Sequence, residues 1–301
     1  MSEQKALRVG PSGIEVAYER FGDPEAPPVL LVMGLAAQMH GWHEGFCDEL
    51  VARGVQVVRF DNRDTGLSSH FSHGPVPDMA AALAGDTSSA SYTLSDMAAD
   101  AIALADLLGW DGAHLVGASL GGAIAQTAAI EHPGRVRSLT TVMSTTGDTS
   151  VGQARPEMLG AFAGPPAVTR QEVIDRMVRI SRAAGSPGFA FDEAEVAARA
   201  GRAYDRSYDP PGVLRQAVAA LASGDRTELL RALDLPTLVI HGADDPMCDV
   251  SGGRATAAAV PGAELLVIEG MGHSLPRALW PVLADRITGF VHHAESERGN
   301  A

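Results

Sequence analysis

One stretch, residues 112–125, constrains the fold of this 301-residue chain more than any other. An apolar run leads into Gly117-Ala118-Ser119-Leu120-Gly121 and continues as an Ala-rich segment with helical spacing. This order predicts a buried strand, a sharp turn at Ser119 and then a helix. The glycines two residues before and after the serine leave room that larger side chains would fill. Because a glycine-rich chain can show Gly-x-Ser-x-Gly by chance, the rest of the sequence must support this interpretation.

Apolar strands and helices alternate on both sides of this stretch. We expect a hairpin at 6–9 and 14–20, followed by buried strands at 29–33, 55–60, 112–118, 136–144, 235–241 and 263–268. Strands that are apolar along their whole length are typical of parallel sheets covered on both faces. The pattern predicts an α/β fold with a mostly parallel, doubly wound sheet of about eight strands.

The alternation stops between residues 145 and 233, where only helical patterns occur. Two of these helices begin at capping boxes, Thr169-x-x-Glu172 and Asp192-x-x-Glu195. Helices inserted into such a series predict a lid, or cap, over one edge of the sheet. We therefore expect an α/β core at 1–144 and 234–295, a helical lid at 145–233 and a C-terminal tail at 296–301. Residues 70–91, rich in Gly, Pro and Ser, are expected to form a long surface loop.

Charge and composition exclude several classes of partner. The net charge of −14 would repel phosphate backbones and anionic lipid, which argues against nucleic acid or a membrane surface as partner. No apolar stretch reaches the roughly 20 residues that cross a bilayer, and residues 1–10 lack the apolar core of a signal peptide. Cys47 and Cys248 form no Cys-x-x-Cys pair, so neither a disulfide framework nor a zinc site is indicated. We expect a cytoplasmic protein without metal or cofactor, and the oligomeric state stays open.

Polar residues that can carry chemistry follow three of the predicted strands. Ser119 follows the predicted strand at 112–118. Asp245 follows the strand at 235–241, and His273 follows the strand at 263–268. Ligands and catalytic groups of α/β sheets gather at the carboxyl ends of strands. A serine hydroxyl becomes a nucleophile when an imidazole accepts its proton, and a carboxylate fixes the tautomer of that imidazole. Asp244 and Asp148 are the alternatives for the carboxylate, and we favour Asp245 because Asp244 is expected to face solvent or cap the turn.

Acyl transfer also needs two backbone N–H groups that stabilise the oxyanion of the tetrahedral intermediate. Leu120 follows the nucleophile directly and is expected to donate one of them. The other should come from the turn after the strand at 29–33, where Leu35 is the candidate.

Four motifs of the chain together resemble the α/β-hydrolase superfamily. They are Gly117-Ala118-Ser119-Leu120-Gly121-Gly122, Asp61-x-Arg63-x-x-Gly66-x-Ser68, His241-Gly242-Ala243-Asp244-Asp245-Pro246 and Gly270-Met271-Gly272-His273. Within the superfamily the chain looks most like the aclacinomycin methyl esterase group, enzymes that demethylate polyketide esters. The resemblance implies Ser119, Asp245 and His273 as a catalytic triad, with Leu35 and Leu120 as oxyanion donors. Many relatives carry a histidine where this chain has Met33.

These observations predict a cofactor-free serine carboxylic-ester hydrolase that works through an acyl-enzyme. Methyl esters or other small to medium apolar esters are the expected substrates. A lactonase with the same triad is one alternative, and a non-catalytic ligand-sensing protein of the same fold is another. Epoxide hydrolases and haloalkane dehalogenases need a carboxylate nucleophile, so Ser119 argues against both. Five apolar side chains of the lid either line a substrate pocket or pack the lid on the core: Phe162, Met177, Ile180, Phe189 and Tyr204.

Overall fold

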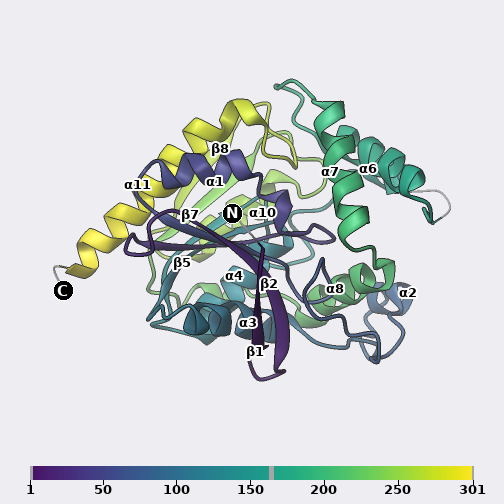
Figure 1. Ribbon diagram of the computed structural model, residues 1–301. Coiled ribbons are helices and arrows are strands. Elements are labelled where there is room, and N and C mark those ends of the chain that lie inside the picture. Colours follow the sequence, from purple (N-terminus) through teal and green to yellow (C-terminus); the bar gives the residue numbers. More distant parts are fainter. Residues whose placement is uncertain (1–2, 163–165, 300–301) are drawn as a thin grey trace.

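The computed structural model describes residues 3–162 and 166–299. They form an eight-stranded sheet with the order β1-β2-β4-β3-β5-β6-β7-β8 (Figure 1). Strands β1 and β2 are antiparallel to their neighbours, and β3 to β8 are parallel. The strands are β1 (Gln4–Val9), β2 (Ile14–Phe21), β3 (Pro28–Val32), β4 (Gln56–Phe60), β5 (Ala113–Ala118), β6 (Val136–Val142), β7 (Thr237–Gly242) and β8 (Glu264–Ile268). The predicted fold class is confirmed.

Helices cover the sheet on both faces because successive strand residues point to opposite sides. Leu30 packs in a cluster with side chains of α3 (Leu94–Leu107) and α4 (Leu120–Glu131). Its neighbour Leu31 packs with α1 (Glu44–Val51) and α11 (Trp280–Gly299) on the other face. Fully burying each such side chain contributes about 1.5–3 kcal/mol. The remaining core elements are η1 (Met39–Gly41), α2 (Met79–Leu83), α10 (Val250–Ala259) and η2 (Arg277–Leu279).

In the described part of the chain between β6 and β7 there are five helices, as the loss of alternation predicts. They are α5 (Pro156–Phe162), α6 (Arg170–Ala184), α7 (Glu193–Arg206), α8 (Pro210–Ser223) and α9 (Thr227–Leu230). Helices α6, α7 and α8 gather on one side of the sheet (Figure 1). Thr169 forms a capping box with Glu172, and the Asp192 side chain accepts a hydrogen bond from the Glu195 amide. We refer to residues 145–233 as the insertion.

Two expectations need correction. Residues 70–91 include the short helix α2, which begins at Met79 because the Asp78 side chain accepts a hydrogen bond from the Ala81 amide. The expected tail at 296–301 is helical through Gly299, since α11 continues past Glu295, which is anchored to the core by His114 and Arg137. Residues 300–301 lie outside the described part of the chain.

Buried ion pairs join the insertion to the loop after β4. Asp61 and Asp64, both buried, lie in this loop. Asp61 Oδ2 is 2.6 Å from Arg206 at the end of α7, and Asp64 accepts hydrogen bonds of 2.9 and 2.8 Å from Arg215 of α8. Removing one member of such a buried pair costs about 3–5 kcal/mol, because the other charge is left without compensation. The insertion is therefore fixed to the core by charge as well as by packing.

The turn between β5 and α4 is crowded by backbone on two sides. A Cβ atom added to Gly117 would lie 2.1 Å from the carbonyl oxygen of Gly121. One added to Gly121 would lie 2.1 Å from the carbonyl oxygen of Val32, at the end of β3. Ser119 itself has φ 54° and ψ −121°, a strained conformation for a residue with a side chain. The predicted reason for both glycines, lack of space, is confirmed.

Among residues 3–162 and 166–299, no helix combines the length and the apolar character that crossing a bilayer requires.

Replacing Gly121 by alanine tests the crowding of this turn. We expect Gly121→Ala to lower the free energy of unfolding by about 3 kcal/mol or more, because its Cβ overlaps the backbone of β3 rather than a flexible side chain. Urea denaturation measures this difference. The matched control is Gly289→Ala in α11, where a Cβ meets open space and the better helix propensity of alanine stabilises by about 1 kcal/mol at most. Equal unfolding midpoints for the two variants would contradict the analysis.

Candidate active site

Ser119 stands at the N-terminal end of α4 and beside the turn that follows β3. A Cβ built on Gly34 would lie 3.1 Å from Ser119 Cβ and 3.6 Å from its Oγ, so the two turns touch. The Ser144 hydroxyl donates a hydrogen bond of 2.8 Å to the carbonyl oxygen of Ser119. Sequence reasoning missed Ser144, which has no motif of its own and reaches the turn only because β6 pairs with β5. Together these contacts hold the strained turn and leave the hydroxyl at the sheet edge.

Asp245 and His273 are brought together. Asp245 Oδ2 lies 2.7 Å from His273 Nδ1, and the carboxylate is fully buried. Its other oxygen, Oδ1, accepts hydrogen bonds from the amides of Met247 and Cys248, at 2.9 and 2.8 Å. A carboxylate fixed at both oxygens determines which nitrogen of the facing imidazole carries the proton. His273 thus presents Nε2 away from Asp245.

The neighbouring acid, Asp244, has a different partner. Its Oδ2 accepts a hydrogen bond of 2.8 Å from the amide of Gly270, in the loop that carries His273. Asp244 therefore holds the backbone of this loop, while Asp245 faces the ring. The expectation that Asp244 caps a turn fits this contact, although the turn belongs to the histidine loop rather than to its own.

Ser119 and His273 lie at the same edge of the sheet, because β5 to β8 are parallel and both residues follow carboxyl ends. Within residues 3–162 and 166–299, no hydrogen bond joins Ser119 Oγ to the His273 ring. Such bonds are often long in the absence of substrate and shorten in the complex. Asp245 is in direct contact with His273, and Ser119 lies against the turn that follows β3.

The amides of the β3 turn separate into bonded and unbonded groups. Ala36 N–H donates to Gln216 Oε1 at 3.3 Å, and Ala37 N–H donates to the Gly34 carbonyl at 3.3 Å. The amide of Leu35, the residue before Ala36, has no hydrogen bond to the described residues, and the Leu35 side chain is exposed. The Leu120 amide begins α4, where N–H groups have no partner within the helix. Both amides expected to face an oxyanion are available to a ligand.

A second histidine lies against Asp245. His241 is buried, and its Nε2 is 2.7 Å from the carbonyl oxygen of Cys248 and 3.6 Å from Asp245 Oδ2. Burial lowers the pKa of His241, so the ring is neutral and donates its Nε2 proton to Cys248. Burial also raises the pKa of the Cys248 thiol to about 12, which leaves it unreactive. The sequence signal for His241, four residues before Asp245, was visible only within the resemblance.

One cluster has the composition of a metal site. Ligand atoms of Asp64, His70 and Asp209 lie within 4.8 Å of one another. Arg215 donates to both carboxylates, and His70 Nδ1 is 2.7 Å from Asp209. A guanidinium at the centre already compensates the acidic charge and would repel a cation. The cluster is therefore an ion-pair network that joins α8 to the loop after β4.

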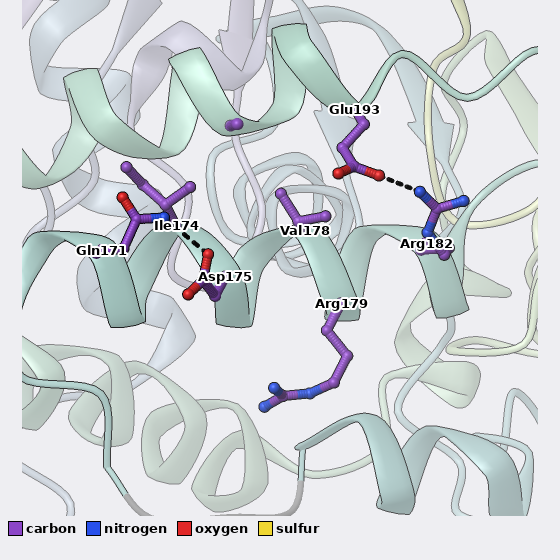
Figure 2. Close-up of a pocket in the computed structure, with 8 residues that line it drawn as sticks. Gln171, Ile174, Asp175, Val178, Arg179, Arg182 and Glu193 are labelled. Carbon is purple, nitrogen blue, oxygen red and sulfur yellow. Dashed lines mark hydrogen bonds and ion pairs between the residues drawn. The ribbon is translucent and has the colours of Figure 1, made fainter.

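A pocket of about 470 Å³ lies between α6 and α7. Figure 2 shows Arg182 paired with Glu193. It also shows Gln171 beside Asp175, and the Gln171 side chain donates a hydrogen bond of 2.8 Å to the Asp175 carboxylate. Neither Ser119, Asp245 nor His273 lines it. Because these polar groups are paired with one another, the pocket is not the candidate active site.

The five apolar side chains proposed for the insertion have different surroundings. Ile180 packs against the cluster of Met158, Ala161 and Ala184, and Met247 packs against the same cluster. Phe189 packs against the core cluster that contains Met271. The other three are more open: Phe162 and Met177 are exposed, and Tyr204 packs on Tyr208 with ring centroids 5.1 Å apart. Packing of the insertion thus accounts for Ile180 and Phe189.

Comparison with known proteins agrees with this architecture. The family described as alpha/beta hydrolase fold matches residues 27–276. Rhodomycin D methylesterase DnrP of Streptomyces peucetius is 31% identical, with 92% of this chain and 94% of that protein aligned. Rhodomycin D methylesterase DauP of Streptomyces sp. (strain C5) is 30% identical over the same shares of the two chains. The resemblance to a methyl esterase group is confirmed.

Solved structures share the fold. The esterase RhEst1 from Rhodococcus sp. ECU1013 has a TM-score of 0.72 at 22% identity, with 97% of this chain and 99% of that chain covered. The 2-hydroxy-6-oxo-6-phenylhexa-2,4-dienoate hydrolase from Rhodococcus sp. strain RHA1 has a TM-score of 0.73 at 19% identity, covering 97% and 100%. The family match over residues 27–276, together with the relative at 31% identity, shows that the chain belongs to the alpha/beta hydrolase fold family.

Proposed function

We propose that this chain is a serine carboxylic-ester hydrolase with Ser119 as nucleophile, His273 as general base and Asp245 as the carboxylate that orients it. The observation that carries the proposal is the 2.7 Å contact between Asp245 Oδ2 and His273 Nδ1, at the same sheet edge as the strained turn of Ser119. A fixed carboxylate, an imidazole and a serine on such a turn are the groups that acyl transfer needs.

The reaction proceeds in two halves. Ser119 Oγ attacks the ester carbonyl carbon while its proton passes to His273 Nε2. The amides of Leu35 and Leu120 donate to the oxyanion. When the tetrahedral intermediate collapses, the bond to the alcohol oxygen breaks, and the alcohol leaves with the proton from His273. Water then attacks the acyl carbon and gives a proton to His273, and the second collapse releases the carboxylic acid and returns the proton to Ser119 Oγ. This cycle consumes one water per ester and requires no cofactor.

Methyl esters of larger molecules are the substrate class that the relatives favour. Two proteins that cover nearly all of this chain at 30–31% identity are methylesterases of rhodomycin D. A methyl ester has a small leaving alcohol, so recognition falls on the acyl part of the substrate. We propose that residues 145–233 act as a lid that selects this acyl part. A lactonase would use the same three side chains, and a panel of methyl esters and lactones of matched size separates the two activities.

Substitution of the nucleophile gives the first test. Wild-type protein should hydrolyse a short p-nitrophenyl ester, and Ser119→Ala should lose at least about 10³-fold in kcat/KM, because no other hydroxyl replaces the attacking oxygen. Ser150→Ala, at an exposed position of the insertion, is the control and should keep full activity. Release of p-nitrophenolate is followed by its visible absorbance, on equal amounts of folded protein. Equal hydrolysis by Ser119→Ala and wild type would refute the mechanism, and an inactive wild type would favour the ligand-sensing alternative.

The adjacent acids give the second test, since they are matched in type and differ in partner. Asp245→Asn should lower kcat by about 10⁴-fold, because an amide donates to His273 Nδ1 and stabilises the wrong tautomer. Asp244→Asn should cost less than about tenfold, because the amide oxygen still accepts from Gly270. Steady-state kinetics with the same ester compares the variants. A larger loss in Asp244→Asn than in Asp245→Asn would reverse the assignment.

A further inference from the structure

The segment between α6 and α7 lies directly against the loop that carries His273. The amide of His273 itself donates a hydrogen bond of 2.8 Å to the carbonyl oxygen of Ala184. The amide of Gly188 donates one of 2.9 Å to the carbonyl oxygen of Gly270. Both bonds join backbone of the insertion to backbone of the core, although the two segments are more than 80 residues apart in sequence. The histidine loop is therefore held from the insertion side as well as by Asp244.

Ser186 makes the only side-chain hydrogen bonds between these two segments within the described residues. Its Oγ accepts a hydrogen bond of 2.9 Å from the amide of Gly272 and lies 2.8 Å from the hydroxyl oxygen of Ser274. One hydroxyl thus contacts the residue before His273 and the residue after it. No part of the proposed chemistry uses Ser186.

The two segments approach so closely that glycine is required at the contact. A Cβ added to Gly272 would lie 2.0 Å from the carbonyl oxygen of Gly185, and one added to Gly188 would lie 2.7 Å from Gly270 Cα. The sequence analysis treats the glycines before His273 as a loop motif. The structure shows a further reason for Gly272, which makes room for the insertion.

Two sets of contacts with different roles fix the imidazole. The bond to Asp245 fixes Nδ1 but leaves the ring free to turn about that contact. Where Nε2 points depends on the position of the backbone from 272 to 274, which the insertion holds at three points. Small displacements of a reacting group lower rates steeply, by as much as about 10²-fold for 1 Å.

We propose that Ser186 is a positioning residue for His273, through which the insertion aligns the general base with Ser119. This inference rests on the proposed function of His273. Because Ser186 belongs to the insertion and not to the core, the base is aligned only while the insertion is seated on the histidine loop. Substrate selection by the insertion and alignment of the base are then coupled through these contacts, of which the Ser186 hydroxyl makes the side-chain ones.

Ser186→Ala tests the proposal in the full-length protein. We expect kcat for the p-nitrophenyl ester to fall about tenfold with KM changed less than about twofold, since alignment and not binding is lost. Ser186→Thr keeps the hydroxyl and should restore most of kcat. Ser181→Ala, on α6 in the same insertion, is the matched control and should behave as wild type.

A second readout needs no turnover. Proton NMR observes the His273 Nδ1 proton, which the Asp245 bond shields from exchange with water. We expect this signal to broaden in Ser186→Ala and to persist in Ser186→Thr and Ser181→Ala. If Ser186→Ala proves unstable by thermal unfolding, Ser186→Cys replaces it, since sulfur has nearly the same shape but accepts hydrogen bonds weakly.

The outcomes separate the two proposals. Equal kcat values for Ser186→Ala and Ser181→Ala with an unchanged Nδ1 signal would overturn the role of Ser186, while loss of activity in Ser119→Ala would leave the esterase proposal intact. A rise in KM at constant kcat would also overturn it, since that result assigns Ser186 to binding. If the wild type hydrolyses no ester, the proposed function fails, and the NMR comparison alone decides whether Ser186 positions the ring.

Discussion

The close approach of the β5–α4 turn to the end of β3 is the constraint on which the rest of the site depends. There is no space for a Cβ at Gly117 or Gly121, because the start of α4 packs directly against the end of β5 and the carbonyl oxygen of Val32. Ser119, between the two glycines, has a strained backbone conformation. The same contact brings the Gly34 turn against the serine. The proposed nucleophile, Ser119, and its two candidate oxyanion donors, Leu35 and Leu120, are thus placed by one packing contact. Strain of this kind persists only where the surrounding structure over-determines it.

Charge fixes the second half of the arrangement. Asp61 and Asp64, in the loop after β4, bind Arg206 and Arg215 of the insertion with both carboxylates buried. Buried pairs of this type add little to stability compared with apolar packing, but they define one geometry because each charge needs its partner. The insertion is therefore seated at one place on the core, and its segment 184–188 reaches the histidine loop from there. The resemblance marked Asp61 and Arg63 as a motif without indicating that this loop holds the insertion.

Features that depend on local sequence could be predicted. Apolar runs fixed the strands, Gly-x-Ser-x-Gly fixed the turn at Ser119, and chain order with strand ends pointed to Asp245 and His273, whose side chains are 2.7 Å apart. Contacts between distant segments could not be predicted, because periodicity carries no information about them. Ser144 and Ser186 are ordinary serines in the sequence, and each acquires a role only from what packs beside it. The helix α2 was missed because five residues show too little periodicity, and the end of α11 because polar residues past Glu295 resemble a tail.

The central claim is that Ser119 is the nucleophile of an acyl-transfer site assembled by these contacts. Reaction with a serine-directed phosphonate, read by intact mass and peptide mapping, tests it most directly because phosphorus forms a stable bond with an activated serine oxygen. The account predicts one phosphonyl group per chain, on Ser119, and no gain of mass in Ser119→Ala. A label on another residue of an ester-hydrolysing wild type, or an unchanged gain of mass in Ser119→Ala, would contradict it.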